Sequence, residues 1–257
     1  MWRSVIAALL GACLALAVGT VFGRTARSKD GATTPQALSF AGAAILGFFA
    51  LFTGFSIAGA WQELNSARQH TYEESRSLTE VYWSSEGMAA DDRRAVQGAL
   101  RNYTHLVIDD EWSQMAAGHG SSAVWLAADR VRTAAEAANA QTTTEVSAKG
   151  DTLQNLTDMF ATRNARLSDI RAVVPGLALG GLIVGSVLVV ATPAVIGMTA
   201  NRRNLMVLCF VGATVAFAVG LVLQLSGPYS GVLKVQPAAF QLALTRYDQM
   251  DAEAAQH

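Results

Sequence analysis

One stretch, from Phe40 to Trp83, sets the limits on what this chain can fold into. It carries no charged side chain before Glu63 and many after it, and no proline separates the two parts. A helix rises about 1.5 Å per residue, so about twenty residues cross the hydrocarbon core of a bilayer and the remainder must project beyond it. We therefore predict a transmembrane helix that leaves the membrane and continues into water as a stalk.

Charge-free segments of this kind recur along the chain. The protein is 51% hydrophobic and 15% charged, and most of its charged residues lie between Glu63 and Arg171. Four windows without charge are each long enough to cross a bilayer. We predict an all-α membrane protein with four transmembrane helices and a helical-bundle extramembrane domain between helices 2 and 3. The spans are expected at about residues 4–23, 36–62, 173–200 and 204–225, within segments 1–62, 63–171 (the bundle), 172–226 and 227–257 (an interfacial helix and tail).

The first window also allows a second interpretation, a cleaved signal peptide. Arg3 precedes the apolar run, Ala15-Leu16-Ala17 resembles a cleavage site, and the residues before Cys13 loosely resemble a lipoprotein motif. Apolar sequence nevertheless continues without a polar break, and small residues recur at every fourth position from Gly11 to Gly23, as in membrane helices that pack closely. A retained helix is favoured, and cleavage stays open.

Aromatic residues mark one face of the second predicted span. Phe48, Phe52 and Phe55 share this face, and small residues occupy the opposite one. The phenylalanines can pack against lipid or a protein core, or they can form a hydrophobic constriction in an oligomeric pore. The pore-lining candidates are Phe48, Phe52 and Phe55 with the polar residues Thr53, Ser56 and Gln62.

Glycines mark the third predicted span as a helix that packs closely. Gly176 and Gly180 are separated by one helical turn, as are Gly181 and Gly185. Small residues at this spacing let membrane helices approach each other. We expect these glycines at helix–helix contacts.

The polar segment 63–171 shows the periodicity of amphipathic helices. Three stripes are predicted to face a core: Leu64, Ala67, Thr71, Leu78 and Val81 with Glu74 between them; Val96, Leu100, Tyr103 and Val107; and Leu153, Leu156, Phe160, Leu167 and Ile170 with Arg163 on the stripe. We predict a small antiparallel bundle whose first and last helices are continuous with the second and third spans.

Capping residues indicate where the helices of this bundle begin. Asp91 is a good N-cap, Ser121 or Ser122 can cap a later helix, and Thr142 with Glu145 three residues on forms a capping box. The acidic run Asp109-Asp110-Glu111 falls near a helix C-terminus, where the helix dipole disfavours it. We interpret this run as a solvated face, with an ion-attracting or partner-facing rim as the alternative.

Glu74 and Arg163 each interrupt an apolar stripe. One interpretation is a buried ion pair inside the bundle, in which loss of either partner would cost about 3–5 kcal/mol. The alternative is that each side chain reaches the edge of the bundle, Arg163 by extending its aliphatic stem. The sequence leaves both open.

Several classes of function are excluded by what the sequence lacks. It has no Gly-rich phosphate loop, no Cys/His metal spacing and no nucleophile elbow, so we expect no enzyme, no metal and no cofactor. The net charge of −1 gives no reason to expect a nucleic acid partner. No acidic, basic or histidine side chain lies inside a span, which argues against proton pumps and charge-carrying transporters. A passive pore remains allowed.

Short motifs carry a resemblance to a known family. They are the Phe/Gly-rich second span ending in Trp61, Glu74-Ser75-Arg76-Ser77-Leu78, Tyr103 with Glu111-Trp112, Arg163 with Arg166-Leu167, and Gly227-Pro228-Tyr229-Ser230-Gly231. With two spans, a helical domain and two more spans, the chain resembles the bacterial bestrophin-like integral membrane family. The resemblance covers most of the chain from about residue 36 onward.

The resemblance implies a function. Bestrophins are pentameric anion channels with a pore along the symmetry axis, a hydrophobic neck on the second helix and cytosolic helices. It implies neck roles for Phe48, Phe52 and Phe55, a homo-oligomer (a pentamer by resemblance) in the lipid bilayer, an inorganic anion as the permeant ion and a cytoplasmic polar domain. The chain departs from bestrophins in its small domain, its short tail and the lack of an acidic calcium clasp.

The predicted function is thus a passive ion channel in the cell membrane. The alternative is a non-conducting scaffold or sensor whose helical domain binds a protein partner. The positive-inside rule does not settle orientation, because basic residues in the short loops (Arg24, Arg27, Lys29, Arg202 and Arg203) are balanced by those near the domain-side ends of spans two and three.

Overall fold

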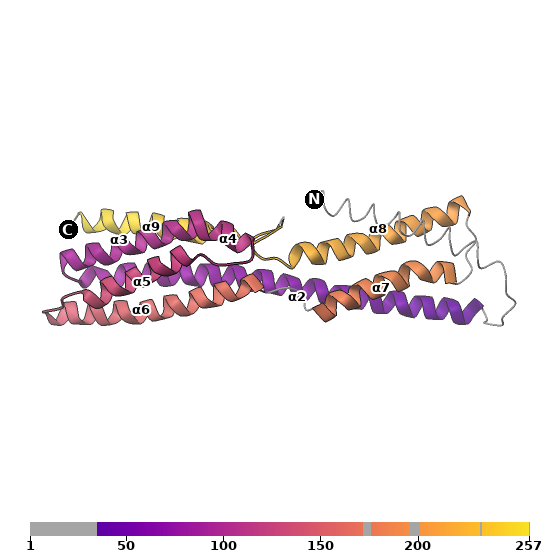
Figure 1. Ribbon diagram of the computed structural model, residues 1–257, viewed down its shortest axis with the longest axis horizontal. Coiled ribbons are helices and arrows are strands. Elements are labelled where there is room, and N and C mark those ends of the chain that lie inside the picture. Colours follow the sequence, from indigo (N-terminus) through magenta and orange to yellow (C-terminus); the bar gives the residue numbers. More distant parts are fainter. Residues whose placement is uncertain (1–34, 172–175, 196–200, 232, 257) are drawn as a thin grey trace. The chain divides into compact units, whose positions relative to one another are not determined.

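The computed structural model describes residues 35–171, 176–195, 201–231 and 233–256, and all regular elements among them are helices (Figure 1). Two compact units form: Met1–Gln62 with Val173–Ser226, and Glu63–Ala172 with Gly227–His257. The first predicted span, at 4–23, lies outside the described residues. The helix predicted to continue unbroken through Glu63 is present, since α2 (Pro35–Ser84) is one 50-residue helix and the boundary between the units falls within it.

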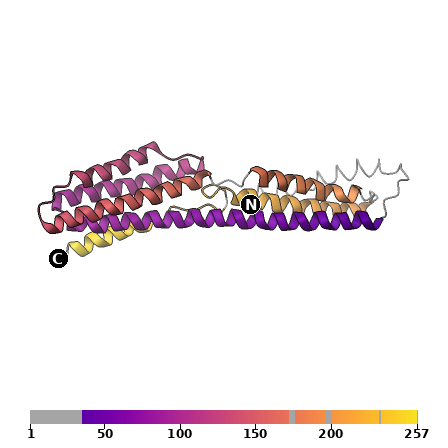
Figure 2. The same cartoon turned by 90° about the horizontal axis from the view of Figure 1, so that it is seen from below.

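The first unit consists of apolar helices lying side by side. The first part of α2 packs with α7 (Gly176–Val195) and α8 (Arg202–Leu225), as both views show (Figures 1 and 2). Its core joins all three helices through Phe49, Leu182, Val189, Val215 and Val222. Among the described residues two helices, at Ser39–Gly87 and Arg202–Leu225, are long and apolar enough to cross a membrane, and Ala178–Pro193 is a shorter apolar helix.

The outer surface of this unit is apolar. Large hydrophobic side chains are exposed on all three helices, among them Phe40, Phe48, Leu51, Phe55, Val184, Leu188, Phe210 and Phe217. Soluble monomers rarely expose an apolar area of this extent, so a surface like this one is typical of helices covered by lipid or by further protein.

The second unit is a helical bundle around the later part of α2. It contains α3 (Ala90–Leu106), α4 (Trp112–Ala116), α5 (Ser122–Ala137), α6 (Thr143–Ser168) and α9 (Ala238–Ala254), with short 3-10 helices at Ser85–Gly87 and Asp169–Arg171 (Figure 2). A π-helix, Val107–Glu111, joins α3 to α4. The predicted stripes on α2 and α3 are buried throughout, from Leu64 to Val81 and from Val96 to Val107.

The chain after Gly227 contains one helix. The sequence indicated a short interfacial or docking helix and a tail, and α9 extends to Ala254 as part of the bundle. The Tyr247 ring stacks on the Tyr82 ring of α2 with centroids 4.2 Å apart, and the Tyr82 hydroxyl donates a hydrogen bond to Asp251 at 2.6 Å. These contacts make α9 a structural element of the bundle.

Capping residues set the start of two bundle helices as predicted. The Ser121 hydroxyl accepts from the backbone N–H of Val124 at the start of α5, and Thr142 and Glu145 complete a capping box on α6. The prediction for α3 differs: Ala89 is its N-cap, without a side-chain bond, and Asp91 lies in the first turn. There a carboxylate stabilises the helix through the dipole instead of through a cap.

Candidate functional site

A cluster of charged side chains lies in the centre of the second unit. Glu74 comes from α2, Glu111 from the π-helix, and Arg163 and Arg166 from α6, and all four side chains are completely buried. Two carboxylates and two guanidinium groups cancel in charge. A buried ion is costly unless it is paired and hydrogen-bonded, so these residues are tolerated only as a set.

The ion pairs of this cluster differ from the predicted pair of Glu74 with Arg163. Glu74 and Arg163 lie in the same cluster, but their nearest charged atoms are 3.9 Å apart. The close partner of Arg163 is Glu111, which accepts from Nη2 at 2.5 Å and from Nη1 at 2.9 Å. Glu74 instead accepts from Arg166 Nε at 2.5 Å and Nη2 at 3.2 Å. Neither Glu74 nor Arg163 reaches the edge of the bundle, so that alternative is wrong.

Arg166 joins the two pairs into one network. Its Nη2 also donates to Glu111 Oε2 at 2.7 Å. The Tyr103 hydroxyl adds a further link, because it donates to Glu74 at 2.5 Å and accepts from Arg163 Nη1 at 2.9 Å. Four segments of the chain are thereby held by charge-assisted hydrogen bonds, which are about twice as strong as neutral ones.

The π-helix is what brings Glu111 inside. A π-helical turn contains one residue more than an α-helical turn, so it shifts the register of the residues that follow. Asp109 remains exposed, while Glu111 is buried and also accepts from the backbone N–H of Ser121 at 3.3 Å. The interpretation of Asp109-Asp110-Glu111 as a solvated face is therefore wrong for Glu111.

Aromatic rings surround the guanidinium groups. Arg163 lies 4.7 Å from the Trp125 ring centroid, and Arg166 lies 5.7 Å and 5.3 Å from those of Trp112 and Phe240. Cation–π attraction is strongest where water is excluded, as it is here. Trp112 in turn meets the edge of Tyr229 with centroids 5.6 Å apart.

The electrostatics keep the cluster ionised. Burial alone would raise the pKa of Glu111, but the guanidinium groups of Arg166 and Arg163 outweigh it and lower that pKa below the ordinary carboxyl value. Burial opposes the charge on Arg166, yet Glu74 and Glu111 hold its pKa well above the ordinary guanidine value. Burial and the Glu74 carboxylate raise the pKa of Tyr103. The charges compensate one another, and only Arg163 Nε lacks a hydrogen-bond partner within the cluster, which suits a structural role.

A second, smaller pair lies where α6 ends. His70 Nδ1 of α2 is 2.8 Å from Asp169 Oδ2, and Asp169 is almost fully buried. Burial raises the pKa of Asp169, and the hydrogen bond from His70 offsets part of that rise. Among the described residues, no group of three or more His, Cys, Asp or Glu could hold a metal ion.

The pore-lining candidates of α2 separate into two groups. Phe48 and Phe55 are 70% and 69% exposed, and the Phe48 ring stacks on that of Phe52 with centroids 6.3 Å apart. Phe52, predicted on the same face, turns toward α7, where a Cβ on Gly181 would lie 3.1 Å from its ring. We therefore assign Phe52 to packing within one chain and leave the exposed face to Phe48 and Phe55.

The polar candidates lie in different environments. Thr53 is buried. The Ser56 hydroxyl donates to the Phe52 carbonyl at 2.9 Å, and Gln62 is exposed.

The glycines of α7 also differ from one another. A Cβ on Gly185 would lie 3.1 Å from the Phe49 ring, so Gly181 and Gly185 both face α2. Gly180 has open space beside it, and Gly176 is the first residue of α7. Close packing against α2 thus involves the pair Gly181 and Gly185. The sequence did not show that Gly180, at the same spacing from Gly176, would have no close neighbour.

Comparison with known proteins places the chain in a family. A family model described as a bestrophin-like domain matches residues 5–240. The chain belongs to the bestrophin-like family. The motif residues of this bestrophin-like chain gather in space: Glu74, Tyr103, Glu111, Arg163 and Arg166 form the buried network, and the Tyr229 hydroxyl donates to the Arg166 carbonyl at 3.3 Å. No curated protein and no solved structure gave a significant match.

Proposed function

We propose that this bestrophin-like protein is a homo-oligomeric, passive ion channel of the cell membrane, with anions as the permeant ions. Family membership supports the channel class. The composition of the first unit supports passive conduction, because the described parts of α2 before Glu63, α7 and α8 carry no charged side chain apart from Arg202 and Arg203 at the start of α8. Pumps and coupled transporters need buried acids or bases to move charge.

The observation that carries the proposal is the exposed phenylalanine face of α2. Phe49 and Phe52 pack on α7, whereas Phe48 and Phe55 remain exposed among the described residues. In a closed ring of identical subunits, every copy of such a face can point at the symmetry axis. A ring of phenylalanines there would form a hydrophobic constriction that controls hydration of the pore.

The proposed arrangement has four spans, including the one predicted at 4–23, and the helical bundle in the cytoplasm. The buried charge cluster then has a mechanical role. It fixes the later part of α2 within its bundle through Glu74, so the helix that carries the constriction continues into a rigid support. A pentamer is the expected stoichiometry on the basis of the family resemblance.

The test is conduction by purified protein in planar bilayers. We expect wild-type currents whose reversal potential follows the chloride gradient, and Phe55→Ala and Phe48→Ala should change conductance or rectification because they widen the constriction. Phe210→Ala on α8 is the matched control: Phe210 is 76% exposed, like the two test residues, but lies on another helix.

Three results would contradict the proposal. They are the absence of current under any voltage or salt gradient, a stable monomer in detergent and in bilayers, and equal effects of Phe55→Ala and Phe210→Ala. Absent current from an intact oligomer would leave the scaffold or sensor role, in which the bundle binds a protein partner.

A further inference from the structure

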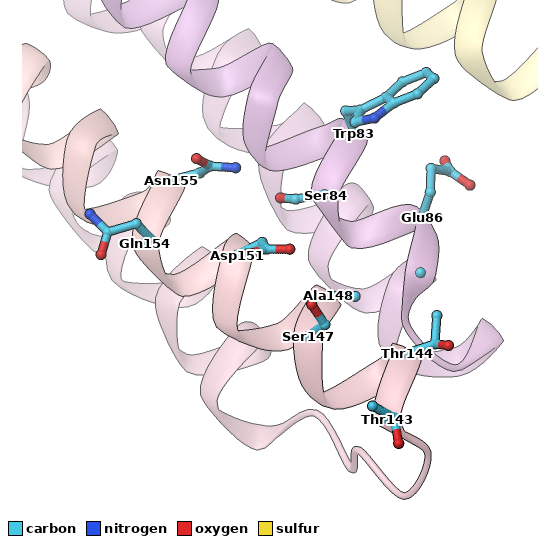
Figure 3. A pocket seen from close by; sticks show the side chains of 11 residues that line it. Trp83, Ser84, Glu86, Thr143, Thr144, Ser147, Ala148, Asp151, Gln154 and Asn155 are labelled. Carbon is cyan, nitrogen blue, oxygen red and sulfur yellow. The ribbon is translucent and has the colours of Figure 1, made fainter.

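A groove lies between α2 and α6 on the surface of the bundle, away from the buried charge cluster. It consists of two neighbouring cavities, of about 800 and 440 Å³, that share Asn155 in their walls. Figure 3 shows the larger cavity: Asp151 and Ser147 of α6 face the end of α2 at Ser84, with Trp83 and Glu86 at the rim.

The floor of the larger cavity is held rigidly. Thr152 donates to the Ser84 hydroxyl at 3.0 Å across the two helices, and Asn155 donates to the Glu80 carbonyl at 3.4 Å. Gly87 sits so close to α6 that an added Cβ would lie 2.8 Å from the Ala148 Cβ. The groove is therefore a fixed feature of the helix packing.

The charged side chains along the two cavities are nearly all acidic. The carboxylates are Glu73, Glu80, Glu86, Asp151 and Asp158, and the single basic residue is Arg76. Arg76 lies 3.9 Å from Glu80, and Glu86 is bound by Arg93 and Gln97. Asp151 and Asp158 make no ion pair or hydrogen bond through their side chains to any described residue.

The acids are spaced along the groove and do not converge. Glu73 and Glu80 are seven residues apart on α2, as are Asp151 and Asp158 on α6, so each pair is separated by two helical turns, or about 10 Å. A metal ion needs ligands around one point, which this spacing does not provide. Anions are excluded by the sign of the charge.

Trp83 adds an aromatic ring to the lining of the groove. Trp83 is 56% exposed and lines the same cavity as the unpaired Asp151. The face of an indole ring attracts organic ammonium groups more strongly than the ring faces of tyrosine and phenylalanine do. The ligand that fits this groove has several ammonium groups on an apolar chain. Its ammonium groups match the spaced carboxylates and the exposed tryptophan, and its chain matches the length of the two neighbouring cavities.

We propose that the groove between α2 and α6 binds a linear aliphatic polyamine. Its ammonium groups pair with Asp151 and Asp158, its methylene chain lies along the groove, and one end meets the Trp83 ring. The hydroxyls of Thr143, Thr144 and Ser147 on the α6 side provide acceptors for the remaining N–H groups. The site is independent of whether the protein conducts ions.

The test uses spermidine as the probe and the full-length protein in detergent. Calorimetric titration should detect binding to the wild type that weakens as salt is added. Asp151→Asn with Asp158→Asn should weaken it about tenfold or more, and Trp83→Ala should weaken it separately. The matched control is Asp109→Asn with Asp129→Asn, two exposed acids outside the groove, which should bind spermidine as the wild type does.

The affinity should also depend on ligand length and charge, so the diamine putrescine should bind more weakly than spermidine. Circular dichroism checks that the variants keep their helices, and the substituted side chains are exposed. Equal spermidine affinity in the wild type and the Asp151/Asp158 variant would overturn the proposal. So would binding of an oligolysine peptide without binding of spermidine, since the groove would then be a docking surface for a protein.

Discussion

Breaking the buried cluster from both sides should cost no more free energy than breaking it from one side. Glu111→Gln leaves two guanidinium groups with one carboxylate, and Arg163→Met leaves the opposite excess. Removing one partner of a buried pair costs about 3–5 kcal/mol, because the remaining charge stays buried without compensation. That is a large part of the 5–15 kcal/mol that stabilises a typical domain.

The double variant restores neutrality. Glu74 and Arg166 keep their paired hydrogen bonds, and no excess charge remains. We therefore expect the double variant to be about as stable as either single variant, which corresponds to a coupling free energy of about 3–5 kcal/mol. If the singles do not fold, Tyr103→Phe gives a milder perturbation, since loss of its hydroxyl should cost about 1–3 kcal/mol.

Guanidinium unfolding of the full chain in detergent, followed by tryptophan fluorescence, measures these free energies. Trp112 and Trp125 contact the cluster and report on it directly. The control is the exposed pair Arg76 and Glu80, whose loss should cost less than ~1 kcal/mol. Additive effects of Glu111→Gln and Arg163→Met, or a cost for either no larger than that of the exposed pair, would refute the reasoning.

Further predictions follow from single contacts. Gly181→Ala should lower the thermal midpoint, because the new Cβ would displace the Phe52 ring at a cost of about 1–3 kcal/mol, while Gly180→Ala, which faces open space, should not. Thr142→Ala should cost about 1 kcal/mol in unfolding experiments through loss of the cap. The pKa of Glu111 is lowered in the fold, so its stabilisation is complete above the ordinary value of 4.5 and is lost as the pH falls through the lower folded value. Glu111→Gln should flatten the dependence of unfolding free energy on pH in acid; an unchanged slope would contradict this.

The sequence predicted the helices better than it predicted the partners of the charged residues. The α2 and α3 stripes follow the ordinary 3.6-residue period, and the structure buries both. On α6 the buried face is rotated from the prediction. Leu156 and Arg163 of the predicted stripe are buried, but so are Met159 and Arg166 beside it, while Phe160 and Leu167 are only half buried. The pattern of apolar residues does not predict the buried face of α6, because arginine is normally a surface residue. It is buried only where carboxylates pair with it.

Glu111 could not be placed by periodicity at all. A π-helical turn breaks the 3.6-residue period, and nothing in the pattern of apolar residues marks its position. One signal was available: three acids near a helix C-terminus are unfavourable, and such a violation of a local rule often indicates a special environment. The family motifs were the other signal, since Glu74, Tyr103, Glu111 and Arg166 meet in one network.

The π-helix at Val107–Glu111 has a consequence for how relatives should be aligned with this chain. Its surplus residue is what turns Glu111 toward Arg163 and Arg166. A relative that lacks that residue would have an ordinary turn, and an acid at the equivalent column would then face water. Such a relative could form the same network only with its acid at a neighbouring position. A correct alignment would therefore contain a one-residue gap in this turn, whereas an ungapped alignment would show a substitution of Glu111.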